Sequence, residues 1–235
     1  MIPPQANAAF VAAMEDILAV YAQPVDPARP LVCFDEAGKD LKAPKRPSQP
    51  AAPGQLARED SEYQRGGSRN LFLLLAPYLG QRHLTVTARR TACDFAWAIR
   101  DLVDVHFPDA ERIVLVLDNL NTHRPASLYR VFPPAEAWRL LAKLEWHYTP
   151  THGSWLNMAE LEWSVLSRQC LRRRIGDQPT LETELAAWVA ARNAEQVTVT
   201  WHFTAEEART RLPWLYPPHD APLSSPLVWL EHPHA

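Results

Sequence analysis

The sequence has few cysteines and no long apolar run, and these two absences narrow the class of protein. Its three cysteines, Cys33, Cys93 and Cys170, are widely separated and odd in number, without the paired spacing of a zinc site. No apolar stretch approaches the roughly 20 residues that cross a bilayer. The first residues, MIPPQANAAF, lack the basic and apolar segments of a secretory signal. We therefore expect a protein of a reducing cytoplasm that does not associate with membranes.

Lysine is also scarce, with 4 residues against 20 arginines, and the net charge is −3. A negative chain gives no overall case for nucleic acid as a partner. Arginine suits bidentate phosphate contacts, but a GC-rich genome favours it too, and we rank the genomic explanation first. The cations form three local clusters, each of which is by itself more often a solvated face. These clusters are Lys39, Lys42, Lys45 and Arg46; Arg82, Arg89 and Arg90; and Arg168, Arg172, Arg173 and Arg174.

The spacing of apolar residues predicts a mixed α/β protein with about five strands. The expected strands are 31–34, 70–77, 83–88, 113–117 and 143–148. The expected helices are 7–22, 92–106, a stretch near 134–143, 154–170 and 181–193. Asn7, Ser154 and Thr180 are residues that can cap three of these helices.

Proline-rich segments suggest where the domain ends. The stretch 42–62 contains four prolines and reads as a long loop, and six more prolines follow Leu212. We expect an N-terminal helix and linker at 1–29, the main domain at 30–212, and a proline-rich tail at 213–235. The apolar tail residues at 227–230 could dock on a second copy, pack on their own domain or stay disordered.

An aspartate directly follows each of two apolar runs. Asp35 comes after LVCF, and Asp118 comes after IVLVL, an uninterrupted run typical of a central strand. In open α/β sheets, ligands bind in the crevice at the carboxyl ends of strands. Two carboxylates there can share a hard cation such as Mg²⁺ or Mn²⁺. Each aspartate taken alone could equally begin a turn.

The helix expected at 154–170 carries a third carboxylate on its polar face. At about 100° per residue, Asn157 and Glu160 share one stripe, whereas Leu161 and Glu162 fall on the apolar side. Glu160 could therefore project into a cleft, although a solvated helical glutamate is the commoner case. Glu162 needs a partner for its charge or a gap in the packing.

Three segments stand in a recognisable order: VCFDE, LDNLNTH and HYTPTHGSWLNMAELEWSVL. The second has Asp-Asn with a histidine five residues after the aspartate. The third has a proline turn, then Leu-Asn, then a glutamate three residues after that asparagine. Together they resemble the catalytic blocks of the Tc/mariner superfamily of transposases, in particular the bacterial insertion-sequence family six-thirty. Each block alone is a weak signal, but the three in order are a strong one. The resemblance as a whole covers about residues 30 to 212.

The resemblance implies an RNase H-like fold and a DNA transposase. Such an enzyme cleaves transposon ends by phosphodiester hydrolysis and joins them to target DNA by transesterification. The family's catalytic triad falls on Asp35, Asp118 and Glu160, which would hold Mg²⁺ or Mn²⁺ as two ions, with Asp35 bridging both. The spacing of 160 − 118 = 42 positions is somewhat long for the superfamily, and the extra residues fit within 124–143.

Other residues would support this triad. The resemblance gives Asn119, His123 and Asn157 roles beside the ligands or facing phosphates, although His123 could equally make a structural hydrogen bond. Glu36 alternates to the other side of its strand, and we do not expect it to be a ligand.

The resemblance also names DNA, as transposon ends and target, as the partner. Cations near the triad would contact its phosphates, namely Lys42, Lys45, Arg46, Arg168, Arg172 and Arg173. Family members act as dimers or higher assemblies and recognise their ends through upstream helix-turn-helix modules. The roughly thirty residues before Asp35 are too few for such a module. We therefore expect a homodimer or higher oligomer, a separate or upstream helix-turn-helix segment, and a bacterial cytoplasmic protein that joins the nucleoid when bound to DNA.

Two other functions stay open. An inactive or domesticated RNase H-like protein could keep the fold in order to bind DNA. Another metal-dependent nuclease of the same fold could share the triad. A serine hydrolase is disfavoured, because HGSWL has no strand–Gly-x-Ser-x-Gly elbow.

Overall fold

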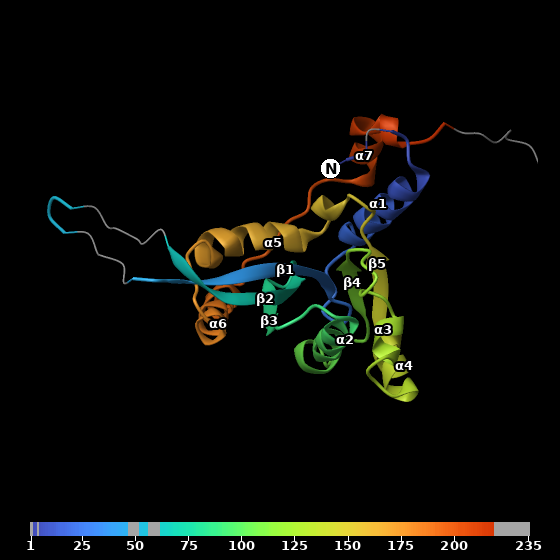
Figure 1. Ribbon diagram of the computed structural model, residues 1–235. Helices are drawn as coiled ribbons and strands as arrows, with labels where there is room; N and C mark the ends of the chain where they lie inside the picture. Colours follow the sequence, from blue (N-terminus) through green and yellow to red (C-terminus); the bar gives the residue numbers. More distant parts are fainter. Residues whose placement is uncertain (1, 4, 47–51, 56–61, 219–235) are drawn as a thin grey trace, which may run out of the picture.

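The apolar runs 31–34 and 113–117, which stand before Asp35 and Asp118, lie on neighbouring strands in the interior of the sheet. The computed structural model describes residues 2–3, 5–46, 52–55 and 62–218 (Figure 1). All five residues of β4 (Ile113–Leu117) are buried, and so are residues 32–34 of β1 (Leu31–Pro44). Leucine and β-branched side chains on both faces favour such an interior position.

The sheet has five strands in the order β3-β2-β1-β4-β5. β2 (Tyr63–Ala76) pairs antiparallel with both β1 and β3 (Gln81–Thr87). β4 and β5 (Leu144–Tyr148) run parallel to β1. The mixed five-stranded sheet of the RNase H-like fold is therefore confirmed.

β1 and β2 extend further than the sequence predicted. Their antiparallel pairing runs out to Pro44 and Tyr63, with a bulge between Asp40 and Lys42. The expectation of a short strand at 31–34 and a loop from residue 42 is therefore wrong. The outer part of this hairpin is polar and partly exposed, and its backbone bonds are satisfied between the two strands, so no apolar pattern marks it. As a result, Asp35 lies within β1 rather than at its end.

Helices cover both faces of the sheet, and each face has its own apolar core. One core lies under α1 (Ala8–Tyr21), α5 (Met158–Leu166), α6 (Gln178–Ala194) and α7 (Ala205–Arg211). The other lies under α2 (Ala92–Asp101), α3 (Ala126–Tyr129) and α4 (Pro134–Ala142). In Figure 1, α1, α5 and α7 lie above the sheet and α2, α3 and α4 lie below it. Single helical turns occupy Leu102–His106, Ser154–Leu156, Ser167–Leu171 and Pro213–Leu215.

The helix caps were only partly predictable. Asn7 caps α1 as expected, since its side chain accepts a hydrogen bond from a first-turn N–H at 2.9 Å. The other two expected caps are wrong. Asp177, rather than Thr180, caps α6, because proline fits the first turn and the helix starts earlier. Asn157, rather than Ser154, caps α5, because Ser154 already begins a separate 3₁₀ turn.

The N-terminal helix belongs to the same packed body as the sheet. Phe10, Met14 and Ile17 of α1 are buried in the core beneath α5. The division at residues 1–29, 30–212 and 213–235 stays a prediction, and the apolar tail residues 227–230 lie outside the described residues. Within the described ranges, no helix is both long and apolar enough to cross a membrane.

Candidate active site

The register of two parallel strands brings Asp35 and Asp118 to the same level of the sheet. β1 and β4 pair through Cys33 and Val116, and each aspartate comes two residues further along the chain, Asp35 within β1 and Asp118 directly after the end of β4. Adjacent strands lie about 4.8 Å apart, so the backbones of these residues are neighbours. Cys33 packs in the core beneath α5. Because side chains alternate along a strand, Asp35 points to that same face.

A buried asparagine ties the start of α5 to β1 beside Asp35. The Oδ1 atom of Asn157 accepts from the backbone N–H of Ala159 at 3.1 Å, which caps the helix. Its Nδ2 atom donates to the carbonyl oxygen of Phe34 at 2.9 Å. Glu160 lies in the first turn of α5 and is exposed. The cap therefore anchors the helix turn that carries Glu160 to the strand that carries Asp35.

The electrostatics of Asp35 show that acidic groups gather here. The pKa of Asp35 is raised to about 7, mainly by burial and in addition by the negative charges of Glu160, Asp118 and Glu36. A hydrogen bond at 2.8 Å from the backbone N–H of Glu36 to Oδ1 opposes part of this rise. Asp118 and Glu160 are thus each near enough to Asp35 for their negative charges to disfavour its ionisation.

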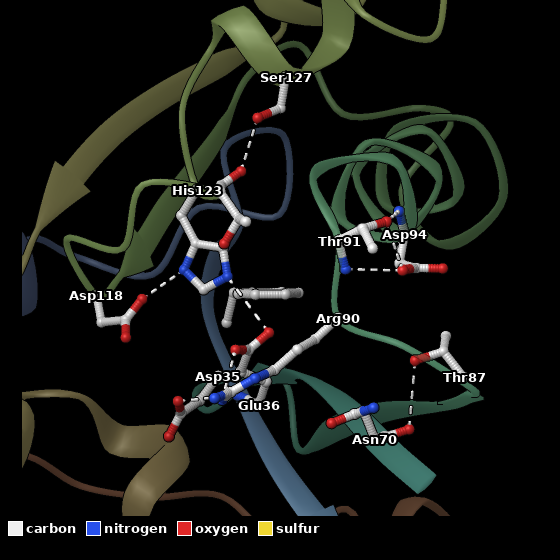
Figure 2. A network of polar contacts seen from close by, with 12 residues as sticks. Asp35, Glu36, Asn70, Thr87, Arg90, Thr91, Asp94, Asp118, His123 and Ser127 are labelled. Atoms are coloured by element: carbon white, nitrogen blue, oxygen red, sulfur yellow. Dashed lines mark hydrogen bonds and ion pairs between the residues drawn. The ribbon is translucent and has the colours of Figure 1, made fainter.

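Asp118 is held by a histidine from the following loop, as Figure 2 shows. Its Oδ1 atom shares a hydrogen bond with Nδ1 of His123, which is fully buried. The imidazole packs edge-on against Phe34, with ring centres 5.0 Å apart, and lies 4.8 Å from Phe95. Burial lowers the pKa of His123, but the neighbouring carboxylates of Asp118 and Glu36 outweigh it and raise the pKa to about 9. The ring is therefore an oriented partner of Asp118.

Glu36 lies on the opposite face of β1 from Asp35. Its Oε1 atom pairs with a guanidinium nitrogen of Arg90 at 3.2 Å, and its Oε2 atom is 3.6 Å from Nε2 of His123. Figure 2 shows this order, with Arg90 reaching Glu36 and the histidine between Glu36 and Asp118. A chain of polar contacts therefore runs from Arg90 to Asp118 beneath the expected site.

A divalent cation suits the chemistry of the three carboxylates, although they are not assembled around an ion position. Among the described residues, no three His, Cys, Asp or Glu are grouped so that they could hold a metal. Asp118 points one oxygen to His123 instead. All three side chains offer hard oxygen donors, which Mg²⁺ and Mn²⁺ prefer. A cation would also offset the repulsion that raises the pKa of Asp35.

Asn119, which follows Asp118, is exposed and faces a different hollow. This hollow, of about 170 Å³, lies between α1 and the end of β5 and includes Phe10 and Tyr148 in its walls. Asn119 therefore lines this hollow, whereas His123 is the residue that bonds to Asp118.

An open groove of about 690 Å³ runs along the hairpin next to the site, and we call it the basic groove. It is lined by Gly38, Lys39, Asp40, Lys42, Ser68, Arg69, Asn70, Arg90, Arg172, Arg173 and Arg174. Seven of these are cations and one is an acid, so the groove is strongly positive although the chain is negative overall.

The basic groove brings together members of all three cation clusters that the sequence showed. It includes Lys42, Arg172 and Arg173 of the predicted DNA-binding set. The exposed side chains of Lys45, Arg46 and Arg168 do not line it, and Lys45 pairs with Glu62 at 3.0 Å. Sequence reasoning did not single out Arg69, and it grouped Arg90 only with Arg82 and Arg89. Arg69 reaches the groove through the pairing of β1 with β2, and Arg90 reaches it from the segment between β3 and α2. No short motif encodes either placement.

One expected surface cation is in fact in the core. Arg82 is fully buried and donates from Nε to Glu162 at 2.7 Å. Arg192 donates to the same carboxylate at 3.0 and 3.1 Å. The need of Glu162 for a partner is confirmed, whereas the grouping of Arg82 with the surface cations is wrong. Leu161, expected on the apolar side, is 50% exposed because the helix turns that position away from both cores.

Comparison with known proteins supports both the fold and the family. The family model of the DDE superfamily endonuclease matches residues 30–182. The structure of the Mos1 mariner paired-end complex with Mn is similar at a TM-score of 0.57 and 16% identity, covering 84% of this chain and 61% of that one. The Mos1 strand transfer complex matches at a TM-score of 0.53 and 15% identity, covering 84% and 61%.

A third structure, the mariner Mos1 paired-end complex with Mg, matches at a TM-score of 0.51 and 15% identity, covering 93% of this chain and 66% of that one. The chain thus spans about three fifths of the length of the first of these neighbours. No curated protein matches significantly. At these identities the structural likeness shows the fold, and the match over residues 30–182 shows the family: the chain belongs to the DDE superfamily of endonucleases.

Proposed function

We propose that this chain is the catalytic domain of a DDE transposase that cleaves transposon ends and joins them to target DNA with divalent metal ions. The observation that carries the proposal is that the negative charges of Asp118 and Glu160 both act on the half-buried Asp35. The register of β1 and β4 sets Asp35 beside Asp118, the charges of Asp118 and Glu160 act on Asp35, and the chain belongs to the DDE superfamily.

In this proposal Asp35, Asp118 and Glu160 would hold Mg²⁺ or Mn²⁺, expected as two ions. Such ions supply an activated oxygen nucleophile and stabilise the departing 3′ oxygen of a phosphodiester. His123 binds Oδ1 of Asp118 and so orients that carboxylate. Asn157 anchors the helix turn that bears Glu160. Asn119, at the rim of the neighbouring hollow, could contact DNA beside the site.

The basic groove is the proposed path of the DNA backbone next to the carboxylates. Lys and Arg side chains supply most of the non-specific affinity for DNA, because they neutralise phosphates. Lys42, Arg172 and Arg173 lie in the groove. The exposed Lys45, Arg46 and Arg168 would extend the contact beyond it. A negative chain with one positive groove directs DNA to a single face.

Further features of the proposal come from the resemblance. The bound DNA would be transposon ends and target, and the chain would act as a dimer or larger assembly at the bacterial nucleoid. Recognition of specific ends would need a separate or upstream helix-turn-helix segment. Membership of the insertion-sequence family six-thirty stays a prediction.

The test is cleavage of supercoiled plasmid by the purified chain with Mg²⁺ or Mn²⁺. We expect weak, metal-dependent nicking that is lost in Asp118→Ala, which removes one carboxylate. With an oligonucleotide bearing a transposon end and a free 3′-OH, we expect joined products. Nicking without joining would favour a different nuclease of the same fold. DNA binding without nicking would favour an inactive relative and would contradict the proposal.

A further inference from the structure

Arg90 takes part in both the basic groove and the polar contacts around Glu36. Its guanidinium lines the basic groove, and it also pairs with Oε1 of Glu36 at 3.2 Å. The Arg90 side chain is 63% exposed, and a single contact from so exposed a cation is weak. A DNA phosphate in the groove offers charged oxygens in a geometry that guanidinium can bind bidentately. Arg90 is therefore a group that DNA can draw away from Glu36.

Glu36 has a second partner in reach. Its side chain is only 6% exposed, and Oε2 lies 3.6 Å from Nε2 of His123, just beyond hydrogen-bond range. That nitrogen is among the buried polar atoms that lack a hydrogen bond in the described part of the chain. A buried donor without an acceptor is costly, so a small movement of Glu36 toward it is favourable.

His123 is well placed to pass that movement on to Asp118. Its ring is packed against Phe34 and Phe95, and its carbonyl oxygen accepts from the hydroxyl of Tyr148 at 2.9 Å. The ring is thus held by packing on its faces and edges and by Asp118 at Nδ1, whereas Nε2 has no hydrogen-bond partner among the residues that the structure describes. A bond from Glu36 to Nε2 would hold the second ring nitrogen as well and so restrict the remaining movement of the bond from Nδ1 to Asp118.

We propose that Arg90 contacts a DNA phosphate in the basic groove and that Glu36, freed by this contact, closes on His123 and fixes the orientation of Asp118. This inference rests on the proposed function. Arg90 is thus a DNA-contacting residue, whereas Glu36 and His123 are positioning residues. Occupation of the groove would be coupled to readiness of the carboxylates for metal, and by linkage metal would tighten DNA binding to the same degree.

The experiment follows the side-chain ¹H and ¹⁵N NMR signals of His123 in the metal-free full chain. When a DNA duplex of mixed sequence is added, we expect the Nε2–H proton to move downfield and to exchange more slowly with water. Arg90→Gln removes the charge that holds Glu36, so its His123 signal is expected at the shifted position before DNA is added. A spectrum of Arg90→Gln identical to that of the free wild-type chain would overturn the proposal.

Arg172→Gln is the matched control, because Arg172 lines the same groove but lies outside the chain of contacts through Glu36. The slope of log affinity against log salt is negative, and each variant should reduce its magnitude by about 1, as for the loss of one phosphate contact. At saturating DNA, Arg172→Gln should still show the wild-type shift of His123. DNA that saturates the wild-type chain without moving this signal would also refute the coupling.

The two proposals fail in different ways. Absence of DNA binding would contradict the proposed function and the role given to Arg90. The comparison of Arg90→Gln with the wild-type chain needs no DNA, and it decides the link from Arg90 through Glu36 to His123 by itself.

Discussion

Asp35 sits at the point where burial and neighbouring negative charge act together, and its pKa is raised to about 7. In the unfolded chain this group has a pKa near 3.9. The folded protein therefore binds a proton that the unfolded chain has released between these two values. Its stabilising effect is complete below about pH 4 and is lost as the pH rises through about 7.

The first prediction concerns the effect of Asp35 on the stability of the fold at different pH. Without metal, Asp35→Asn should be more stable than the wild-type chain at pH 8 by on the order of 4 kcal/mol, or roughly 10 °C in Tm. At pH 4.5 the two should differ little. Thermal unfolding across this range measures the difference, and addition of Mn²⁺ should stabilise only the wild-type chain. If the stability of both chains depended equally on pH, the pKa of Asp35 would not be raised in the folded protein, and the prediction would be wrong.

The residues of the candidate site were predictable to different degrees. Asp35 and Asp118 stand directly after apolar runs, and that local pattern is visible in the sequence. The contact of Glu36 with Arg90 joins residues 54 positions apart, across separate elements of the fold. The raised pKa of Asp35 depends on burial and on three-dimensional neighbours. Such properties arise only when the chain is folded, so the sequence could not supply them.

At the scale of secondary-structure elements, the placement of α5 decides where Glu160 lies. One end of this helix is capped by Asn157, which also binds β1. Two residues beyond Glu160, the buried Glu162 is bound by Arg82 of β3 and Arg192 of α6. The helix is therefore fixed to three other elements by polar contacts in addition to its apolar face.

A second prediction concerns this buried cluster. Glu162→Leu should destabilise the fold by about 3–5 kcal/mol, because it leaves the fully buried Arg82 without a counter-charge. The double variant Arg82→Met, Glu162→Leu should lose less, since no isolated charge stays in the core. Urea unfolding of both variants gives the comparison. A double variant less stable than Glu162→Leu would mean that the other hydrogen bonds of Arg82 matter more than its charge.

The elements themselves were predictable where an apolar face is present. β4 is buried along its whole length, as its sequence IVLVL predicts. The outer half of β1 beyond Asp35 has no such pattern, because pairing with β2 rather than burial holds it. The same pairing turned an expected loop into strand and created one wall of the basic groove.

At the scale of the whole molecule, positive charge is concentrated in the basic groove although the chain as a whole is negative. The chain carries a net charge of −3, yet seven cations line the basic groove. A molecule of this kind should bind DNA on one face, without sequence preference, and with strong dependence on salt.

The third prediction measures this arrangement. The slope of log affinity against log salt should be negative, and Arg172→Gln combined with Arg173→Gln should reduce its magnitude by about 2. Arg112→Gln combined with Arg130→Gln, both exposed and outside the groove lining, is the control with the same loss of two charges. Fluorescence anisotropy with a labelled duplex at several salt concentrations is sufficient. An equal effect of the control would show that overall charge, rather than the groove, governs binding.

The central claim is that Asp35, Asp118 and Glu160 share divalent metal. Its most direct test is a crystal structure of the chain with Mn²⁺, read from the anomalous signal of the ion. We predict a peak within roughly 2.0–2.4 Å of oxygens from Asp35 and at least one of the other two carboxylates. Mn²⁺ bound elsewhere, or no peak at saturating Mn²⁺ with Asp118 still bonded to His123 alone, would contradict the account.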